Sequence, residues 1–378
     1  MKNRNLYFIT AITILLFSCN HATNEVVVFD ARNNYPVLDL KLSDIADVEY
    51  IKLNHLQEDI LLRKIDNEGR ALFITDEKIF LVDTRRLFVY DRTGNLIFHI
   101  DREGRGPGEY VMGFQLLVDT TQQKILLFNP PLAKFLIYDF HGSQIAEIFR
   151  GEPIYASATG MIGDQILFYN ETINDFTMAI VDPTEGIIKP FKLNYSLPKI
   201  FDPEGYLGYS QLIDAPGGKF VFTFRSDTLY FISNDLDIRP RFVNKSYNMS
   251  STTLYPPHLY PTMETDKYVF FVSIFAPSLH PEERLKYYVY DKSKMQFFRL
   301  KQLNGKDKYI NSYYWEPLLH NSPEFIWSMI TMNDNYMGSL LAAEYLVEHK
   351  NELPEPLKQI ASTLDEYDNP ILMLIKFR

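Results

Sequence analysis

Apolar residues fall in short, nearly continuous runs that recur along the chain about every fifty residues. Each repeat has an apolar strand, a short gap, a second strand, a tight turn and a third strand. The clearest copies are KIFLVDTRRLFVYDRTGNLIFHI, KILLFNPPLAKFLIYDFHGSQIAEIF and KYVFFVSIFAPSLHPEERLKYYVYDKSKMQFFRL, and the weaker ones are QILFYNETINDFTMAIVDPTEGIIKPF and KFVFTFRSDTLYFISNDLDIRPRF. Strands such as LFVYD and FLIYD are apolar at almost every position, which indicates burial on both faces between stacked sheets.

The turn in each of the five copies is predicted to begin at an Asp. These residues lie 43 to 56 positions apart, at Asp91, Asp139, Asp182, Asp235 and Asp291. This spacing suits four-stranded propeller blades of about 40 to 50 residues with loops of variable length. In the first two copies, the Asp can accept the backbone N–H two residues on, and Gly occupies the fourth, left-handed position. Both copies therefore predict β-hairpins.

The C-terminal part predicts two short helices and a final strand. Helically spaced apolar residues precede and follow Pro354 and Pro356, at Leu340, Leu341, Tyr345, Leu346, Leu357, Ile360 and Leu364. We expect FIWSMITM, NPILMLIKF and the early strand DVEYIKL to share one composite blade, which would close the ring and remove open sheet edges. The sequence thus predicts an all-β fold. It is a single six-bladed β-propeller over residues 45–378, with short C-terminal helices and a terminal strand that closes the composite blade.

The N-terminus predicts a lipoprotein signal peptide over residues 1–19. A basic start with Lys2 and Arg4 precedes an apolar run, Leu6 to Phe17, and LFSC ends at Cys19. The apolar run is shorter than the about 20 residues of a membrane-spanning helix. The LFSC ending resembles a bacterial lipobox, which implies that Cys19 is lipidated and becomes the new N-terminus; an ordinary secretory signal is the alternative. Residues 20–44 are expected to form a tether and N-terminal segment.

Composition narrows the partners and the chemistry. Cys19 is the only cysteine among 378 residues, so no intramolecular disulfide, Cys-based zinc site or thiol nucleophile is available. The net charge is −10 and the sequence pI is about 5.4, which disfavours nucleic acid as a partner. The 25 Tyr and 28 Phe favour strands and also provide flat faces for stacking. A glycan, a peptide or an envelope protein remains open as partner, with membrane contact through the lipid anchor only.

A glycine-rich segment, DREGRGPGEY (residues 101–110), separates two predicted strands. We expect it to cross from the outermost strand NLIFHI of one blade to the innermost strand FQLLVD of the next. Glycines allow the positive φ values that such a crossing needs, and Pro107 stiffens the loop. The GxGxG spacing lacks a following helix, so it does not predict a nucleotide site.

The GRGPGEY segment resembles the hallmark loop of six-bladed, NHL-like β-propeller lipoproteins of glycan-degrading gut bacteria. VEYIKL, FRSDTLYFI, IRPRF and DNPILMLIKF resemble further landmarks of that family, so the resemblance covers residues 45–378. It implies a propeller fold and a location in the bacterial envelope, with the outer membrane as the expected site and the leaflet open. Members of that family mostly have no assigned activity, so the resemblance supplies little chemistry.

No catalytic residue is predicted. The eight His are dispersed, and HExxH, GxSxG, P-loop and EF-hand patterns are absent from the sequence. An enzymatic alternative resembles the six-bladed calcium-dependent lactonases, in which oxygen ligands from several blades hold one cation. The candidates for such a calcium site are Glu109, Asn129, Asn170 and Glu264, although these residue types are also common in turns.

A second group of residues suits a ligand. Arg105, Glu109 and Tyr110 combine a guanidinium, a carboxylate and an aromatic ring, which suits a glycan or a peptide terminus. The alternative is that Arg105 and Glu109 pair and only shape the loop. Arg225 and Asp227 in FRSDTLY have the same two interpretations.

Three functions follow as hypotheses. The first is an envelope-anchored module for ligand or partner binding, with glycan uptake as a candidate context. The others are a metal-dependent hydrolase or lyase with its site at the propeller channel, and a protein-interaction scaffold. Fold alone does not choose among them.

Overall fold

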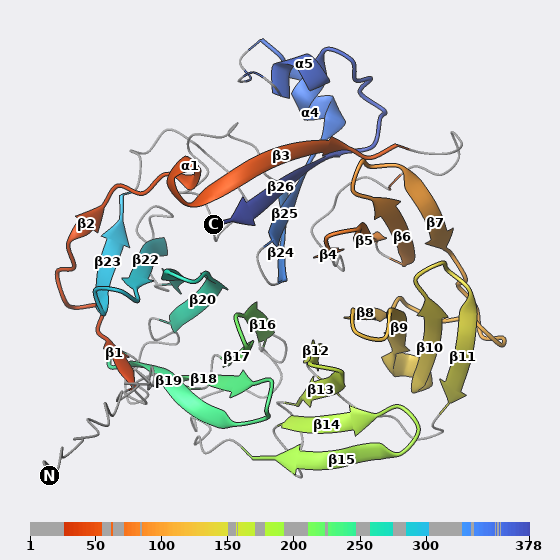
Figure 1. Ribbon diagram of the computed structural model, residues 1–378, viewed down its shortest axis with the longest axis horizontal. Coiled ribbons are helices and arrows are strands. Elements are labelled where there is room, and N and C mark those ends of the chain that lie inside the picture. Colours follow the sequence, from red (N-terminus) through yellow and green to blue (C-terminus); the bar gives the residue numbers. More distant parts are fainter. Residues whose placement is uncertain are drawn as a thin grey trace, which may run out of the picture.

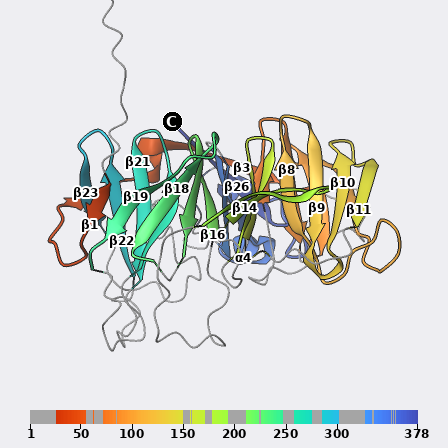
Figure 2. The same cartoon turned by 90° about the horizontal axis from the view of Figure 1, so that it is seen from below.

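The computed structural model describes residues 26–54, 62, 72–83, 85–149, 156, 158–170, 178–192, 211–223, 226–246, 258–274, 285–301, 327–333, 336–351, 353, 355 and 357–378. Six sheets are arranged radially around a common axis (Figure 1). Their strands run between the two faces of a disc, which Figure 2 shows edge-on. The predicted all-β, six-bladed propeller is confirmed. Among the described residues, no helix is long and apolar enough to cross a membrane.

The blades follow one another around the ring, each with its first strand innermost. The first three contain β4 (Leu72–Ile74), β5 (Lys78–Asp83), β6 (Arg86–Asp91) and β7 (Leu96–Ile100); β8 (Gln115–Asp119), β9 (Lys124–Asn129), β10 (Lys134–Asp139) and β11 (Gln144–Phe149), with the 3-10 turn η1 (Pro130–Leu132) after β9; and β12 (Ala158–Ile162), β13 (Gln165–Tyr169), β14 (Met178–Asp182) and β15 (Gly186–Phe191). The next two contain β16 (Gln211–Ala215), β17 (Gly218–Phe222), β18 (Thr228–Ser233) and β19 (Ile238–Asn244); and β20 (His258–Glu264), β21 (Tyr268–Ile274), β22 (Leu285–Asp291) and β23 (Gln296–Leu300).

The sixth blade is composite, as the sequence predicts. It contains β24 (Trp327–Asn333), β25 (Tyr336–Leu341) and β26 (Ile371–Phe377), and its outermost strand is β3 (Ala46–Lys52) from near the N-terminus. β3 and β26 are antiparallel over their full lengths, with Ile51 opposite Leu372. This pairing closes the ring with strands from both ends of the propeller.

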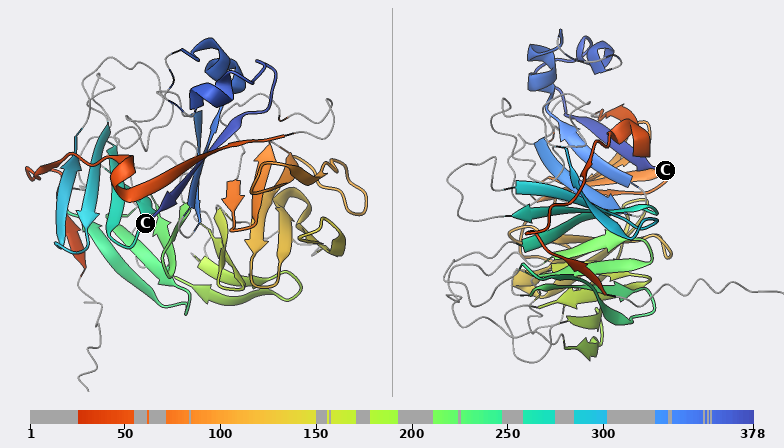
Figure 3. Two further views of the ribbon diagram at one scale, coloured as in Figure 1. Left: turned by 45° about the horizontal axis from the view of Figure 1, so that its top comes forward. Right: turned by 90° about the vertical axis from the view of Figure 1, so that its left-hand side faces the viewer.

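Two short helices, α4 (Ala343–Glu348) and α5 (Leu357–Ala361), lie between β25 and β26 and project from the rim (Figure 3). Both predicted helices are confirmed. Their buried side chains, including Leu346 and Leu357, join the largest apolar core. Leu340 and Leu341, which were assigned to the first helix by their spacing, belong instead to β25.

The N-terminal segment packs against the propeller. β1 (Val27–Phe29) pairs in parallel with β19, β2 (Val37–Leu38) pairs in parallel with β23, and α1 (Leu42–Ile45) leads into β3. The Phe29 ring is fully buried and meets Tyr288 and Phe297 edge-on, at centroid distances of 4.9 and 5.1 Å. The described part of the segment expected to be a tether, residues 20–44, is therefore attached to blades four and five. The signal peptide and Cys19 lie outside the described residues.

The predicted turns form at four of the five Asp residues. At Asp139 the carboxylate accepts the backbone N–H groups of His141 and Ser143, each at 2.9 Å, and Gly142 has φ 87°. Equivalent hydrogen bonds are formed by Asp91, Asp182 and Asp291. The prediction for Asp235 is wrong. The fourth turn begins at Ser233, whose hydroxyl accepts the Asp237 N–H at 3.2 Å, because a Ser oxygen can fill the same role.

The middle strands of the blades are buried on both sides, as their apolar runs predict. In β6, Leu87 through Tyr90 are fully buried. Aromatic rings link neighbouring blades: Phe128 of β9 lies 5.0 Å from Phe168 of β13 between ring centroids. Packing between blades therefore uses the abundant Phe and Tyr side chains that also favour strands.

Candidate functional site

The two faces of the propeller carry connections of different length. On one face, which we call the turn face, each described connection has at most four residues, such as 92–95 and 163–164. The opposite face, which we call the loop face, carries the crossings between blades, including residues 101–114, and the insertion 342–370. Binding residues occur disproportionately on loops held by a rigid scaffold. The loop face is therefore the candidate functional surface.

The glycine-rich loop crosses from β7 at the rim of blade one to the innermost strand β8 of blade two, as predicted. Two backbone hydrogen bonds hold the loop closed. The Tyr110 N–H donates to the Arg102 carbonyl (3.0 Å), and the Gly104 N–H donates to the Tyr110 carbonyl (2.9 Å). The Tyr110 ring is fully buried and meets Phe114 edge-on. Its hydroxyl accepts the Arg102 N–H (3.2 Å) and donates to the Arg85 carbonyl, and burial raises the pKa of Tyr110 to about 12.

Tyr110 is thus a buried anchor of the loop, and its ring offers no exposed face for stacking. Glu109 also acts within the loop, because its carboxylate accepts the Gly106 N–H at 2.6 Å. A Cβ atom on Gly104 would lie 2.0 Å from Glu109 Oε2, so any larger residue here would displace the Glu109 carboxylate. The expected Arg105–Glu109 pair does not form. Arg105 is exposed and has no hydrogen bond or ion pair within the described chain.

A buried lysine of the neighbouring strand β10 forms hydrogen bonds to the loop backbone. Lys134 of β10 donates from Nζ to the Gly106 and Glu109 carbonyls, both at 3.1 Å, and pairs with Glu147 at 2.8 Å. Glu147 also accepts the Gly108 N–H at 2.6 Å. The Lys134 ammonium is the main reason that the pKa of Glu147 lies below its ordinary value. The loop is therefore rigidly supported, and among its charged side chains Arg105 is free to meet a partner.

The four residues proposed as calcium ligands do not converge. Strand directions place Glu109, Asn129 and Asn170 at the loop face, whereas Glu264 ends the first strand of blade five at the turn face. Glu264 is almost fully buried and its carboxylate is neutralised by two cations, Arg241 and Lys292, with a Lys292 distance of 2.6 Å. Among the described residues, no group of three or more His, Cys, Asp and Glu could hold a metal ion.

Asn129 and Asn170 occupy the same position in neighbouring blades. This position lies at or near the end of the second strand of each blade. In blades one to five it is occupied by a buried polar residue: Asp83, Asn129, Asn170, Thr223 and Ser273. Asn129 shows one use of it, because its side-chain amide donates to the carbonyls of Val111 (2.7 Å) and Gly113. Aligning the repeats at KIFLVD, KILLFN and QILFYN would have revealed this ring of polar residues in the sequence.

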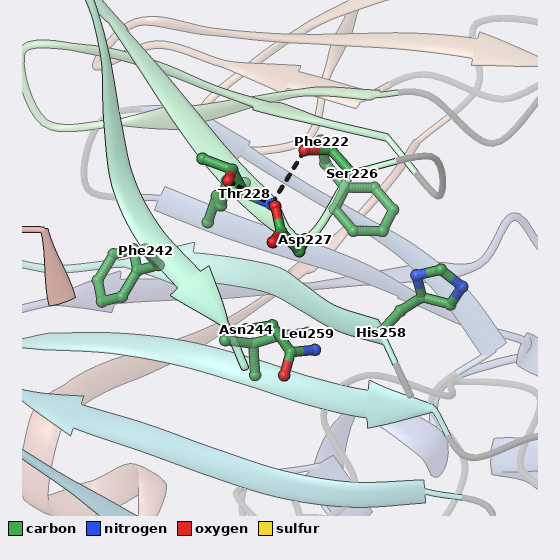
Figure 4. A pocket seen from close by; sticks show the side chains of 9 residues that line it. Phe222, Ser226, Asp227, Thr228, Phe242, Asn244, His258 and Leu259 are labelled. Atoms are coloured by element: carbon green, nitrogen blue, oxygen red, sulfur yellow. Dashed lines mark hydrogen bonds between the residues drawn. The ribbon is translucent and has the colours of Figure 1, made fainter. Parts of the chain in front are cut away.

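A small pocket opens on the loop face between blades four and five (Figure 4). Asp227, one of the predicted ligand residues, lies at its edge; its carboxylate accepts the Thr228 hydroxyl at 2.7 Å. His258, at the start of β20, forms part of the wall, and burial lowers its pKa to about 3, so its ring is neutral. The pocket has room for about one water molecule, which is too little for a sugar or a peptide side chain. Arg225 lies outside the described residues.

Comparison with known proteins places this architecture in a family. A family model described as "Domain of unknown function (DUF4934)" matches residues 25–376, nearly the whole chain. The chain belongs to the DUF4934 family. The match begins just before β1, which agrees with the attachment of the N-terminal segment to the blades.

Two solved structures from Bacteroides are similar to this chain. A "putative exported protein" of Bacteroides fragilis NCTC 9343 is 16% identical to this DUF4934 protein, with a TM-score of 0.63 over 94% of this chain and 100% of that one. A member of the DUF4221 family from Bacteroides vulgatus ATCC 8482 is 14% identical, with a TM-score of 0.46 over 88% and 96% of the two chains. A search among curated proteins finds no match. At 16% identity, the similarity to the Bacteroides fragilis protein establishes the fold alone.

Proposed function

We propose that this DUF4934 protein is an exported, lipid-anchored module of the bacterial envelope that binds a ligand or partner through its loop face, in connection with glycan uptake. The observation that carries the proposal is the division between the faces. Every described connection on the turn face is a tight turn, whereas a crossing loop on the opposite face is rigidly stapled and presents Arg105 without a partner in the described chain.

Rigid support of an exposed group favours recognition. A binding group that is already ordered loses less conformational entropy when it meets its partner. The loop around Arg105 is ordered by Lys134, Glu109 and Tyr110, each of which bonds loop backbone. A guanidinium held in this way suits a carboxylate or the carbonyl and hydroxyl oxygens of a partner.

The envelope location is supported by three features. The LFSC ending places Cys19 where a lipobox would, and a fold neighbour from Bacteroides is described as a "putative exported protein". The resemblance of GRGPGEY to the NHL-like propeller lipoproteins points the same way, toward the outer membrane and glycan-degrading bacteria.

Two arms test the proposal in a Bacteroides host that expresses the full chain. In the first, the protein should fractionate with membranes, and Cys19→Ser should release it. In the second, a photo-crosslinker attached at Pro107→Cys, beside Arg105 on the loop face, should form adducts, and one at Gln165→Cys on the turn face should not. Both positions are exposed. Cys19 is the only native cysteine, so once it is lipidated the introduced thiol is the only one available for labelling. Membrane retention of Cys19→Ser, or equal adducts from both faces, would contradict the proposal.

A further inference from the structure

The innermost strands of blades two to five begin at the loop face, around the common axis of the ring (Figure 1). Gln115, Gln211 and Tyr260 occupy equivalent register positions there. Each pairs with the residue directly before the buried polar position of its blade, namely Phe128, Phe222 and Val272. With Thr159 of blade three, these side chains form a set that we call the mouth residues.

Hydrogen bonds join the mouth residues in two pairs across neighbouring blades. The Thr159 hydroxyl donates to Gln115 Oε1 at 2.6 Å, which links blades two and three. The Tyr260 hydroxyl donates to Gln211 Oε1, which links blades four and five. In both pairs the glutamine oxygen is occupied by a neighbour, and the Nε2 group forms no hydrogen bond within the described chain. Two oriented amide donors are thereby left for a ligand.

The mouth residues are uncharged, and three of the four are accessible. Gln211 is exposed, and Gln115 and Thr159 are half-buried. Tyr260 is mostly buried and meets Phe222 edge-on at 4.7 Å, so its hydroxyl is held in place by its ring. His258, two residues before Tyr260 on the same strand, is neutral. Amides and hydroxyls without formal charge complement groups that both donate and accept hydrogen bonds.

We propose that the mouth residues form a binding site for a neutral, polyhydroxylated ligand of the carbohydrate class. Sugar hydroxyls can accept from Gln115 Nε2 and Gln211 Nε2 and can donate to the Thr159 hydroxyl oxygen. A charged ligand would lack a counter-charge among these four side chains. This site deepens the proposed function, on which it rests, because it names the ligand class and places the ligand at the loop-face ends of the inner strands.

Titration calorimetry on the full chain in detergent micelles tests the site. The probes are neutral hexasaccharides derived from xylan, mannan and glucan, with an oligogalacturonate as the charged comparison. We expect saturable binding of at least one neutral probe, weakened about 2- to 13-fold by Gln115→Leu or Gln211→Leu, because a neutral hydrogen bond contributes about 0.5–1.5 kcal/mol. Gln211→Glu keeps an oxygen for Tyr260 but removes the amide donor, so it should weaken binding as well.

Gln165→Leu is the matched control, since Gln165 is exposed at the start of β13 on the turn face. It should leave binding unchanged. The site is overturned if no neutral probe binds saturably, if only the charged probe binds, or if the double variant of Gln115 and Gln211 binds as well as the native chain. Binding of the parent polymer but not the hexasaccharide would likewise overturn a site of this size. Membrane release by Cys19→Ser and loop-face crosslinking are separate measurements, so their failure is distinguishable from failure of this site.

Discussion

The substitution Asn129→Asp separates the two roles considered for Asn129, a cation ligand and a clamp on the glycine-rich loop. The side chain is fully buried, and its amide donates to the carbonyls of Val111 (2.7 Å) and Gly113. Aspartate has nearly the same shape, but it replaces both N–H donors with acceptors. A cation ligand would become stronger by this change, whereas a clamp would be lost.

The expected cost follows from the two carbonyls that lose their donor. Each buried polar group left without a partner costs about 1–3 kcal/mol, so the free energy of unfolding should fall by roughly 2–6 kcal/mol. The introduced carboxyl group would face two carbonyl oxygens, which raises its pKa in the folded state. A raised folded pKa means that the destabilisation is full at neutral pH and shrinks as the pH falls toward and below about 5.

Urea denaturation followed by far-UV circular dichroism, at pH 7 and pH 5 and with or without millimolar calcium, measures these effects. Asn234→Asp is the control, because Asn234 is exposed in a turn and forms no side-chain hydrogen bond. Unchanged stability of Asn129→Asp, or stabilisation of the variant by calcium, would refute the clamp.

Three further changes test other parts of the structure. Phe29→Ala should cost about 3–5 kcal/mol in urea denaturation, because the buried ring attaches β1 to blade five; Val28→Ala, at an exposed position, is the control, and equal effects would disprove the attachment. Arg105→Ala should change the free energy of unfolding by less than about 0.5 kcal/mol, because the side chain is exposed. A large fall in melting temperature would instead show that Arg105 supports the structure. The pKa of His258 is about 3 in the folded chain and lies below the ordinary 6.5. Between these two pH values, His258 binds a proton in the unfolded chain and not in the folded chain. Stability therefore falls as pH drops from about 6.5 toward 3, and His258→Gln should flatten that dependence between pH 7 and 4; an unchanged slope would contradict the assignment.

The sequence predicted the blades well because each one repeats a local pattern. Turn chemistry at Asp91 and Asp139 and continuous apolar runs are properties of neighbouring residues, and the composite blade follows from unpaired strand patterns at the two ends. The edge strand VVF at Val27–Phe29 was missed, because it has three residues and pairs with Phe242 to Asn244, more than 200 positions away. The fourth turn was misplaced because Ser233 and Asp235 both offer an oxygen within the same few residues.

The site was harder to predict because residue type does not reveal which way a side chain faces. Glu109 and Tyr110 have the chemistry of ligand-binding residues, yet the loop uses both to satisfy its own backbone. Gln115 and Gln211 have unremarkable sequence contexts. Their proposed role depends on strand register, which places both at the loop-face ends of inner strands, where a residue of the next blade donates a hydrogen bond to each side-chain oxygen. A repeat alignment could have found such positions, since register is shared among blades even when the residue types differ.

The GRGPGEY motif, the most recognisable one in the chain, has an architectural role. GRGPGEY is conspicuous because the crossing between blades one and two uses Gly108 at a positive φ, an internal acid at Glu109 that lies against Gly104, and a buried anchor at Tyr110. Those demands are architectural, so the motif should persist wherever this crossing persists, whatever the ligand. Specificity would then lie in positions that the architecture leaves unconstrained, such as Arg105 on the loop and the first residues of the inner strands. Proteins with the same loop and different residues at the start of the inner strands should therefore share the fold and differ in ligand.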